Sequence, residues 1–128
     1  WIEQSEALRW VASASIGLSP IPRGALFDVS SPTKVGEYLA LGIPCVANDI
    51  PDQRWVLEQS RGGFCIPMQI DAFVAAIRTL LLDPEKARFM GAEGRRWISE
   101  HRSYEQLADQ VATTYRMVAI SDTSVTHR

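Results

Sequence analysis

The sequence predicts an α/β fold in which a parallel sheet of about three strands is covered by helices and followed by further C-terminal helices. Helical and strand patterns alternate along the chain, which is typical of parallel strands joined by right-handed crossovers. The strand patterns are short, continuously apolar runs, as expected where helices cover both faces of a sheet. A length of 128 residues with 46% hydrophobic content suits at most one domain.

Each element follows from local spacing. Apolar residues three and four positions apart predict helices, and short apolar runs bounded by proline or glycine predict strands. The predicted elements, in order, are helix 2–14, strand 16–20, loop 21–31, helix 32–41, strand 44–47, loop 48–52, helix 53–59, strand 63–66, helix 70–82, helix 84–101 and a last helix from Ser103. We treat residues 1–120 as one structural unit and residues 121–128 as a flexible polar tail.

Particular residues set the helix ends. Gly42 is suited to end the helix before it, because glycine readily adopts the left-handed conformation that closes a helix. Pro84 takes the first position of the next long helix, and Ser103 caps the last helix with Gln106 in the capping-box region. One face of that last helix is apolar at Leu107, Val111, Tyr115 and Val118.

The loop that leads into helix 32–41 has the features of an anion site. Ser31 is placed to cap the helix, because its hydroxyl can accept a hydrogen bond from a first-turn amide. Pro32 then takes the first helical position, where its missing N–H costs nothing. The amides of Thr33 and Lys34 point out of the helix start, with the positive end of the helix dipole behind them. The Lys34 charge opposes that dipole, and a bound anion such as phosphate would explain why it is tolerated.

Glu37 is the second candidate site residue. It lies one helical turn beyond Lys34 and is followed by an apolar segment. A carboxylate in such surroundings can accept two hydrogen bonds from the hydroxyls of a ribose. The alternative is an ordinary i,i+3 ion pair with Lys34. The residues alone leave both alternatives open.

Other prominent side chains are expected to serve the fold. Three tryptophans at helical spacing are predicted to pack in the core: Trp10, Trp55 and Trp97. Arg102, together with Arg95 and Arg96, is predicted to lie on a solvated face. Gly17 and Gly36 are predicted to permit close packing of the backbone.

Composition and motif spacing exclude several classes of function. The net charge of -2 argues against non-specific nucleic-acid binding, which needs a basic surface. No apolar run approaches the roughly 20 residues that span a bilayer. No Cys/His cluster has zinc spacing, and no Ser-His-Asp or Cys-His arrangement marks a catalytic group, so neither a metal site nor a catalytic residue is predicted. Cys45 and Cys65 are predicted to be reduced thiols in strands, which is consistent with a cytoplasmic setting.

One segment resembles the donor-binding signature of retaining GT-B glycosyltransferases, especially family 4, also called group 1: residues 31–47, S-P-T-K-V-G-E-Y-L-A-L-G-I-P-C-V-A. Weaker similarity extends over residues 5–118 and includes three further segments: 14–20, 62–64 and 103–104. The resemblance implies that residues 1–120 are the C-terminal portion of a Rossmann-like domain that binds a nucleotide-sugar.

The resemblance also assigns roles to the candidate residues. Glu37 matches the glutamate that bonds the ribose hydroxyls of the donor, and residues Ser31, Pro32, Thr33 and Lys34 match the loop whose amides contact its diphosphate. In the family another glutamate stands eight positions before this one, where this sequence has Val29. The Arg and Lys that neutralise the diphosphate in the family fall in a segment that this chain does not contain.

The resemblance implies a hexosyltransferase-like enzyme that transfers a sugar, with retention, from a UDP- or GDP-linked donor without a metal or a cofactor. The sequence lacks an initiator Met and the acceptor-binding N-terminal domain, so we expect a longer parent and an inactive fragment. The parent is expected in the cytoplasm or at the inner face of the membrane. Two alternatives belong to other classes: a non-catalytic nucleotide- or phosphate-binding module, and a structural fragment that forms a homodimer through the exposed edge of its first strand.

Overall fold

The computed structural model describes residues 1–123, with side chains described through residue 119. Within these residues it confirms the α/β class, because three parallel strands form one sheet in the order β1-β2-β3. The elements are α1 Gln4–Ala12, β1 Gly17–Ser19, α2 Thr33–Ala40, β2 Cys45–Asn48, α3 Pro51–Ser60, β3 Gly63–Ile66, α4 Ile70–Leu82, α5 Pro84–His101 and α6 Tyr104–Thr123. Helix α6 thus extends into the predicted tail, and residues 124–128 of that tail lie outside the described residues.

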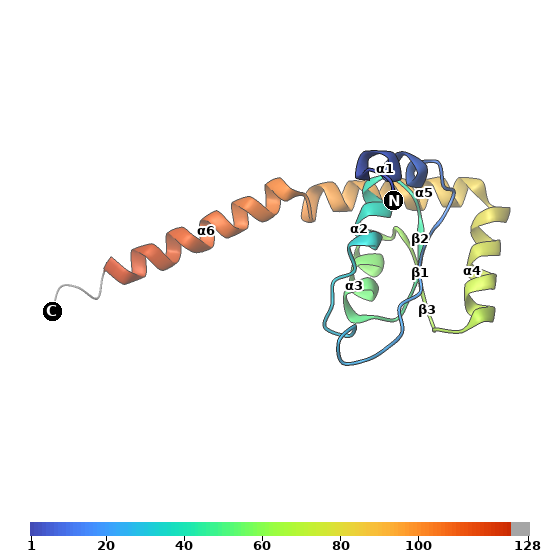
Figure 1. Cartoon of the computed structure of the whole chain (residues 1–128), viewed down its shortest axis with the longest axis horizontal. Helices are drawn as coiled ribbons and strands as arrows, with labels where there is room; N and C mark the ends of the chain where they lie inside the picture. The colour runs from blue at the N-terminus through green and yellow to red at the C-terminus, as the bar shows by residue number, and fades with distance from the viewer. Residues whose placement is uncertain (124–128) are drawn as a thin grey trace.

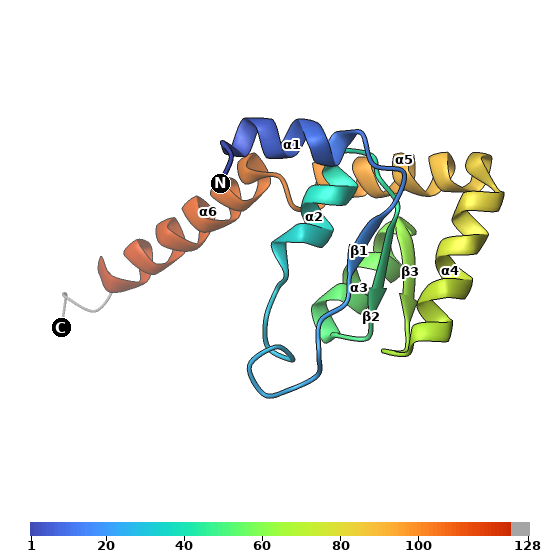
Figure 2. The same cartoon turned by 45° about the vertical axis from the view of Figure 1, so that its right-hand side comes forward.

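Helices cover both faces of the sheet (Figure 1, Figure 2). On one face α2, α3 and α5 enclose a core that includes the fully buried Leu39 and Ala47. On the other face α4 packs Leu80 near Val46 of the central strand. Because the strands are parallel, the loops that follow them meet at one edge of the sheet, and α2, α3 and α4 begin there (Figure 2).

The turn between α2 and β2 shows how one residue sets an element boundary. Gly42 has a φ of 76°, in the left-handed region, and its N–H bonds the Leu39 carbonyl at 2.9 Å. The Ile43 N–H bonds the Tyr38 carbonyl, also at 2.9 Å, which completes a Schellman motif. The predicted role of Gly42 as the helix stop is therefore confirmed.

Close backbone contacts hold α5 against the rest of the fold. A Cβ added at Gly91 would lie 2.0 Å from the carbonyl oxygen of Gly42. A Cβ at Gly94 would lie 2.7 Å from the Leu39 side chain. Two glycines one turn apart thus let α5 cross directly over the end of α2, and this crossing positions the C-terminal end of α5 near the start of α3.

The two glycines predicted to permit close packing behave differently. A Cβ at Gly17 would lie 2.3 Å from the Tyr38 ring, so the prediction is confirmed there. A Cβ at Gly36 would meet no atom within 4 Å. The prediction is wrong for Gly36, because this side of α2 faces open space rather than a neighbouring element.

Helix α6 extends away from the body of the molecule (Figure 1). Ser103 caps its start, as predicted, because the Ser103 hydroxyl accepts a hydrogen bond from the Gln106 N–H at 3.2 Å. The predicted apolar face is exposed in the described part of the chain, with exposed fractions of 44% at Leu107 and 72% at Tyr115. None of the helices in residues 1–123 combines the length and the apolar character needed to cross a membrane.

The prediction that the tryptophans pack in the core is largely wrong. Trp10 is 68% exposed on α1, which contributes no buried side chain, and Trp55 is 48% exposed on α3. Trp97 is partly buried and meets Trp55 edge-on, with ring centroids 5.3 Å apart and planes at 74°. His101 stacks on Trp97 with centroids 4.8 Å apart. The contact between the two tryptophans joins α3 to the C-terminal end of α5.

Candidate functional site

A buried polar network lies where β1 and β2 end. Ser19, Asn48 and Gln53 are all fully buried. The Ser19 hydroxyl donates to the Gln53 side-chain oxygen, and the Gln53 amide donates to the Asn48 carbonyl at 2.9 Å. Buried polar groups cost free energy unless they are paired, and no buried side-chain polar atom among the described residues lacks a partner. The network therefore fixes the carboxyl edge of the sheet.

Asn48 also holds the loop that leaves β1. Predicted to lie in a loop, it is the last residue of β2, and its side chain pairs with Ile21. It accepts the Ile21 N–H and donates to the Ile21 carbonyl, both at 2.7 Å. Farther along the loop Arg23 pairs with Asp28 at 2.7 Å, and this hydrogen bond holds the pKa of Asp28 below its ordinary value. The long loop is thus held at its start and along its length.

The start of α2 differs from the prediction. Ser31 does not cap the helix, because its hydroxyl donates to Oδ2 of Asp52 at 2.8 Å. Pro32 occupies the N-cap position instead of the first helical position, and no side chain caps the helix. A carboxylate is a strong acceptor for a hydroxyl, and Asp52 comes within reach from the first turn of α3. The first-turn amides, from Thr33 onward, therefore have no side-chain cap.

Arg102 completes this contact, so the prediction of a solvated position is wrong for it. Its guanidinium binds Oδ1 of Asp52 at 2.6 Å and Oδ2 at 3.2 Å, and it reaches the Ser31 hydroxyl at 3.4 Å. The Trp55 ring lies 5.1 Å from the same guanidinium. Burial raises the pKa of Asp52, but hydrogen bonds from Arg102 and Ser31 outweigh burial and leave this pKa below its ordinary value. We call Ser31, Asp52 and Arg102 the Ser–Asp–Arg cluster.

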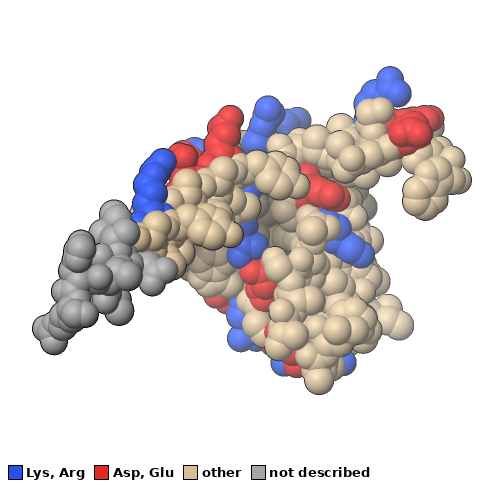
Figure 3. All heavy atoms as spheres, turned by 60° about the vertical axis from the view of Figure 1, so that its left-hand side comes forward, with Lys and Arg blue, Asp and Glu red and all other residues tan. Residues whose placement is uncertain are grey.

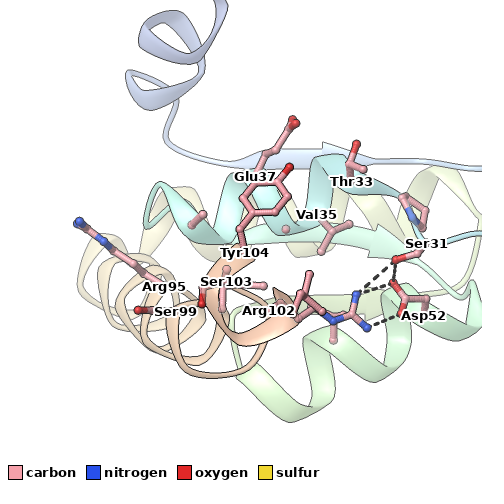
Figure 4. A pocket seen from close by; sticks show the side chains of 16 residues that line it. Ser31, Thr33, Val35, Glu37, Asp52, Arg95, Ser99, Arg102, Ser103 and Tyr104 are labelled. Carbon is pink, nitrogen blue, oxygen red and sulfur yellow. Dashed lines mark hydrogen bonds and ion pairs between the residues drawn. The ribbon is translucent and has the colours of Figure 1, made fainter. Parts of the chain in front are cut away.

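A cavity of about 590 Å³ opens beside the Ser–Asp–Arg cluster (Figure 3, Figure 4). It lies between α2, the C-terminal part of α5 and the first turns of α6. Its lining brings together four of the five predicted site residues: Ser31, Pro32, Thr33 and Glu37. The fifth, Lys34, is outside the lining. Figure 4 shows Glu37 and the Ser–Asp–Arg cluster on separate parts of the cavity wall.

Glu37 is exposed, and the part of the chain that the structure describes contains no ion pair between it and Lys34. The ion-pair alternative is therefore not observed, and the carboxylate can accept hydrogen bonds from a ligand. Two lining residues, Asp52 and Arg102, were missed as site residues, because nothing in the local sequence marks them. Among residues 1–123 no group of three or more His, Cys, Asp or Glu could hold a metal ion.

Similarity to known proteins defines the class to which this chain belongs. Residues 1–113 match the glycosyl transferase-like family, and the chain therefore belongs to that family. Over 96 residues it is 29% identical to GDP-mannose-dependent alpha-(1-6)-phosphatidylinositol monomannoside mannosyltransferase from Mycobacterium tuberculosis; the match covers 73% of this chain and 25% of that protein. The same match is found in two strains of that organism.

A solved structure shares the fold. Sucrose-phosphate synthase from Thermosynechococcus elongatus matches with a TM-score of 0.75 at 23% identity, over 94% of this chain and 29% of that chain. This likeness confirms the fold of a GT-B glycosyltransferase. Together with the family match it confirms the predicted resemblance to the C-terminal region of group 1 GT-B glycosyltransferases. The chain spans about a quarter of the length of the curated mannosyltransferases that it matches.

Proposed function

We propose that this chain is the nucleotide-sugar-binding region of a retaining glycosyltransferase whose complete form transfers the sugar to an acceptor held by another domain. The observation that carries the proposal is a single cavity lined by both Glu37 and the start of α2. Membership of the glycosyl transferase-like family supports the enzyme class. The mannosyltransferase relative is named for GDP-mannose, so GDP is the first nucleotide to test and UDP the comparison.

Glu37 is the proposed anchor for the ribose of the donor. Its two carboxylate oxygens can accept hydrogen bonds from two neighbouring hydroxyls at once, which a ribose offers. Because the residue lines the cavity and is not engaged by Lys34, binding would not require an existing ion pair to break.

The start of α2 is the proposed cradle for the diphosphate. The amides of Thr33 and Lys34 belong to the helix turn whose N–H groups have no intrahelical acceptor, and the helix dipole favours negative charge there. When the bond between the sugar and the diphosphate breaks, negative charge grows on the leaving diphosphate. Donors already aimed at that charge lower the barrier, which is the contribution that this chain can make to the reaction. We expect the isolated chain to bind nucleotide and to transfer no sugar, because the acceptor site belongs to another domain.

Isothermal titration calorimetry with GDP and UDP tests this proposal on the full chain. We expect Glu37→Gln to weaken binding about tenfold, because a hydrogen bond to a charged acceptor contributes about 1.5–3 kcal/mol. Glu58→Gln is the matched control, since Glu58 is an exposed glutamate on α3 outside the cavity lining. Failure of the wild type to bind either nucleotide, or equal binding by the Glu37 and Glu58 variants, would contradict the proposal.

One observation favours a second candidate function, self-association. In the described part of the chain β1 pairs only with β2, so its other edge is unpaired, and Leu18 on this strand is 41% exposed. Two copies could join these edges into one continuous sheet. Light scattering decides this candidate: a dimer that binds neither GDP nor UDP supports it, and a monomer contradicts it.

A further inference from the structure

The Ser–Asp–Arg cluster joins three segments that are far apart in sequence. Ser31 precedes α2, Asp52 lies in the first turn of α3, and Arg102 follows α5. The Ser31 hydroxyl donates to Asp52, and the Arg102 guanidinium donates to both other members. All three side chains line the cavity that also contains Glu37 (Figure 4).

The charge on this part of the cavity wall depends on Arg102. The Asp52 and Arg102 side chains retain only 25% and 31% of their exposure. An unpaired carboxylate here would repel an anionic ligand, whereas the two-pronged guanidinium contact neutralises it. No other cation forms an ion pair with Asp52 among the described residues.

The conformation at Ser31 depends on the same contact. Ser31 stands one residue before the N-cap residue Pro32, in the loop that enters α2. Here Asp52 accepts the hydrogen bond of the Ser31 hydroxyl, and the helix start has no side-chain cap. Loss of the contact would leave this loop without its tether to α3.

We propose that Asp52 and Arg102 are positioning residues of the donor site, which tether Ser31 in the loop that enters α2 and keep the cavity wall neutral for a nucleoside diphosphate. This inference rests on the proposed function and goes beyond it, because it assigns a role to two residues outside the predicted site. Neither residue needs to touch the ligand: Asp52 orients Ser31, and Arg102 balances the charge of Asp52.

Calorimetric titration of the full chain tests this inference, with whichever of GDP and UDP the wild type binds more tightly. Arg102→Gln leaves the negative charge of the Asp52 carboxylate without its partner. We expect about fivefold weaker binding, because two like unit charges about 4 Å apart in water repel each other by about 1 kcal/mol. The loss should shrink in high salt, which screens that repulsion. Asp52→Asn combined with Arg102→Gln restores neutrality, so this double variant should regain most of the lost affinity.

Arg96→Gln is the matched control, because Arg96 lies on α5, one to two turns before Arg102, but pairs with Glu93 outside the cavity. Circular dichroism establishes that every variant is folded. The inference is overturned if the Arg102→Gln variant binds the nucleotide as tightly as the Arg96→Gln variant does. It is also overturned if the double variant binds no more tightly than Arg102→Gln alone. If the wild type binds neither nucleotide, the proposed function is overturned. If the wild type binds a nucleotide and Arg102→Gln binds it equally well, only this inference is overturned.

Discussion

Gly36→Ala is expected to stabilise the fold and to weaken nucleotide binding. The residue lies within α2, where glycine costs about 0.5–1 kcal/mol relative to alanine because it loses more backbone freedom on folding. A Cβ at this position meets no atom within 4 Å, so no clash offsets that gain. In a domain of this size the gain raises the melting temperature by about 3 °C.

The effect on binding has the opposite sign because Gly36 lines the cavity. The added methyl group would enter the space that we assign to the donor, and overpacking of this kind costs about 1 kcal/mol or more, which is at least about fivefold in affinity. Urea unfolding followed by circular dichroism measures the stability, and calorimetry with GDP and UDP measures the affinity. A lower stability would refute the open geometry at Gly36. A higher stability with unchanged affinity would refute the placement of the nucleotide beside α2.

Two further predictions concern the sheet. Asn48→Ala removes both hydrogen bonds to the Ile21 backbone and should lower the free energy of unfolding by about 2–4 kcal/mol in urea titrations. The control variant Thr79→Ala removes one exposed hydrogen bond within α4 and should change that free energy by about 0.5 kcal/mol at most. Equal effects of the two variants would contradict the prediction. Burial raises the pKa of Cys45 from 9.0 to about 12, so above pH 9 the unfolded thiol ionises while the folded one stays protonated, and stability falls. Between pH 8 and pH 10 the free energy of unfolding of the wild type should fall by about 1 kcal/mol more than that of Cys45→Ala. If the unfolding free energies of the two proteins change in parallel with pH, folding does not raise the pKa of this thiol.

The boundaries of the elements were largely predictable because their signals act within one helical turn. The φ of 76° at Gly42 closes α2, and the hydroxyl of Ser103 caps α6 through an amide only three positions away. Such contacts depend on neighbouring residues and not on the rest of the fold. The sequence alone therefore indicates these boundaries.

The partners of the site residues were not predictable, because these partners lie far away in the sequence. Ser31 binds Asp52, 21 positions away, and Arg102, 71 positions away, and both approach only after the sheet has brought α2, α3 and α5 together. The local sequence predicted a capping serine and a solvated arginine, and the competing carboxylate changed both. The exposure of Trp10 was missed for a related reason, because helical spacing identifies an apolar face without showing whether another element covers it.

The edge-on pair of Trp55 and Trp97 has a spectroscopic consequence. Two indoles with centroids 5.3 Å apart and planes at 74° couple their electronic transitions, and such coupling produces a circular dichroism couplet that isolated tryptophans lack. The couplet disappears when the two rings separate, even where helix content is unchanged. The chain thus carries its own optical reporter of the contact between α3 and α5, beside the Arg102 guanidinium that lines the cavity.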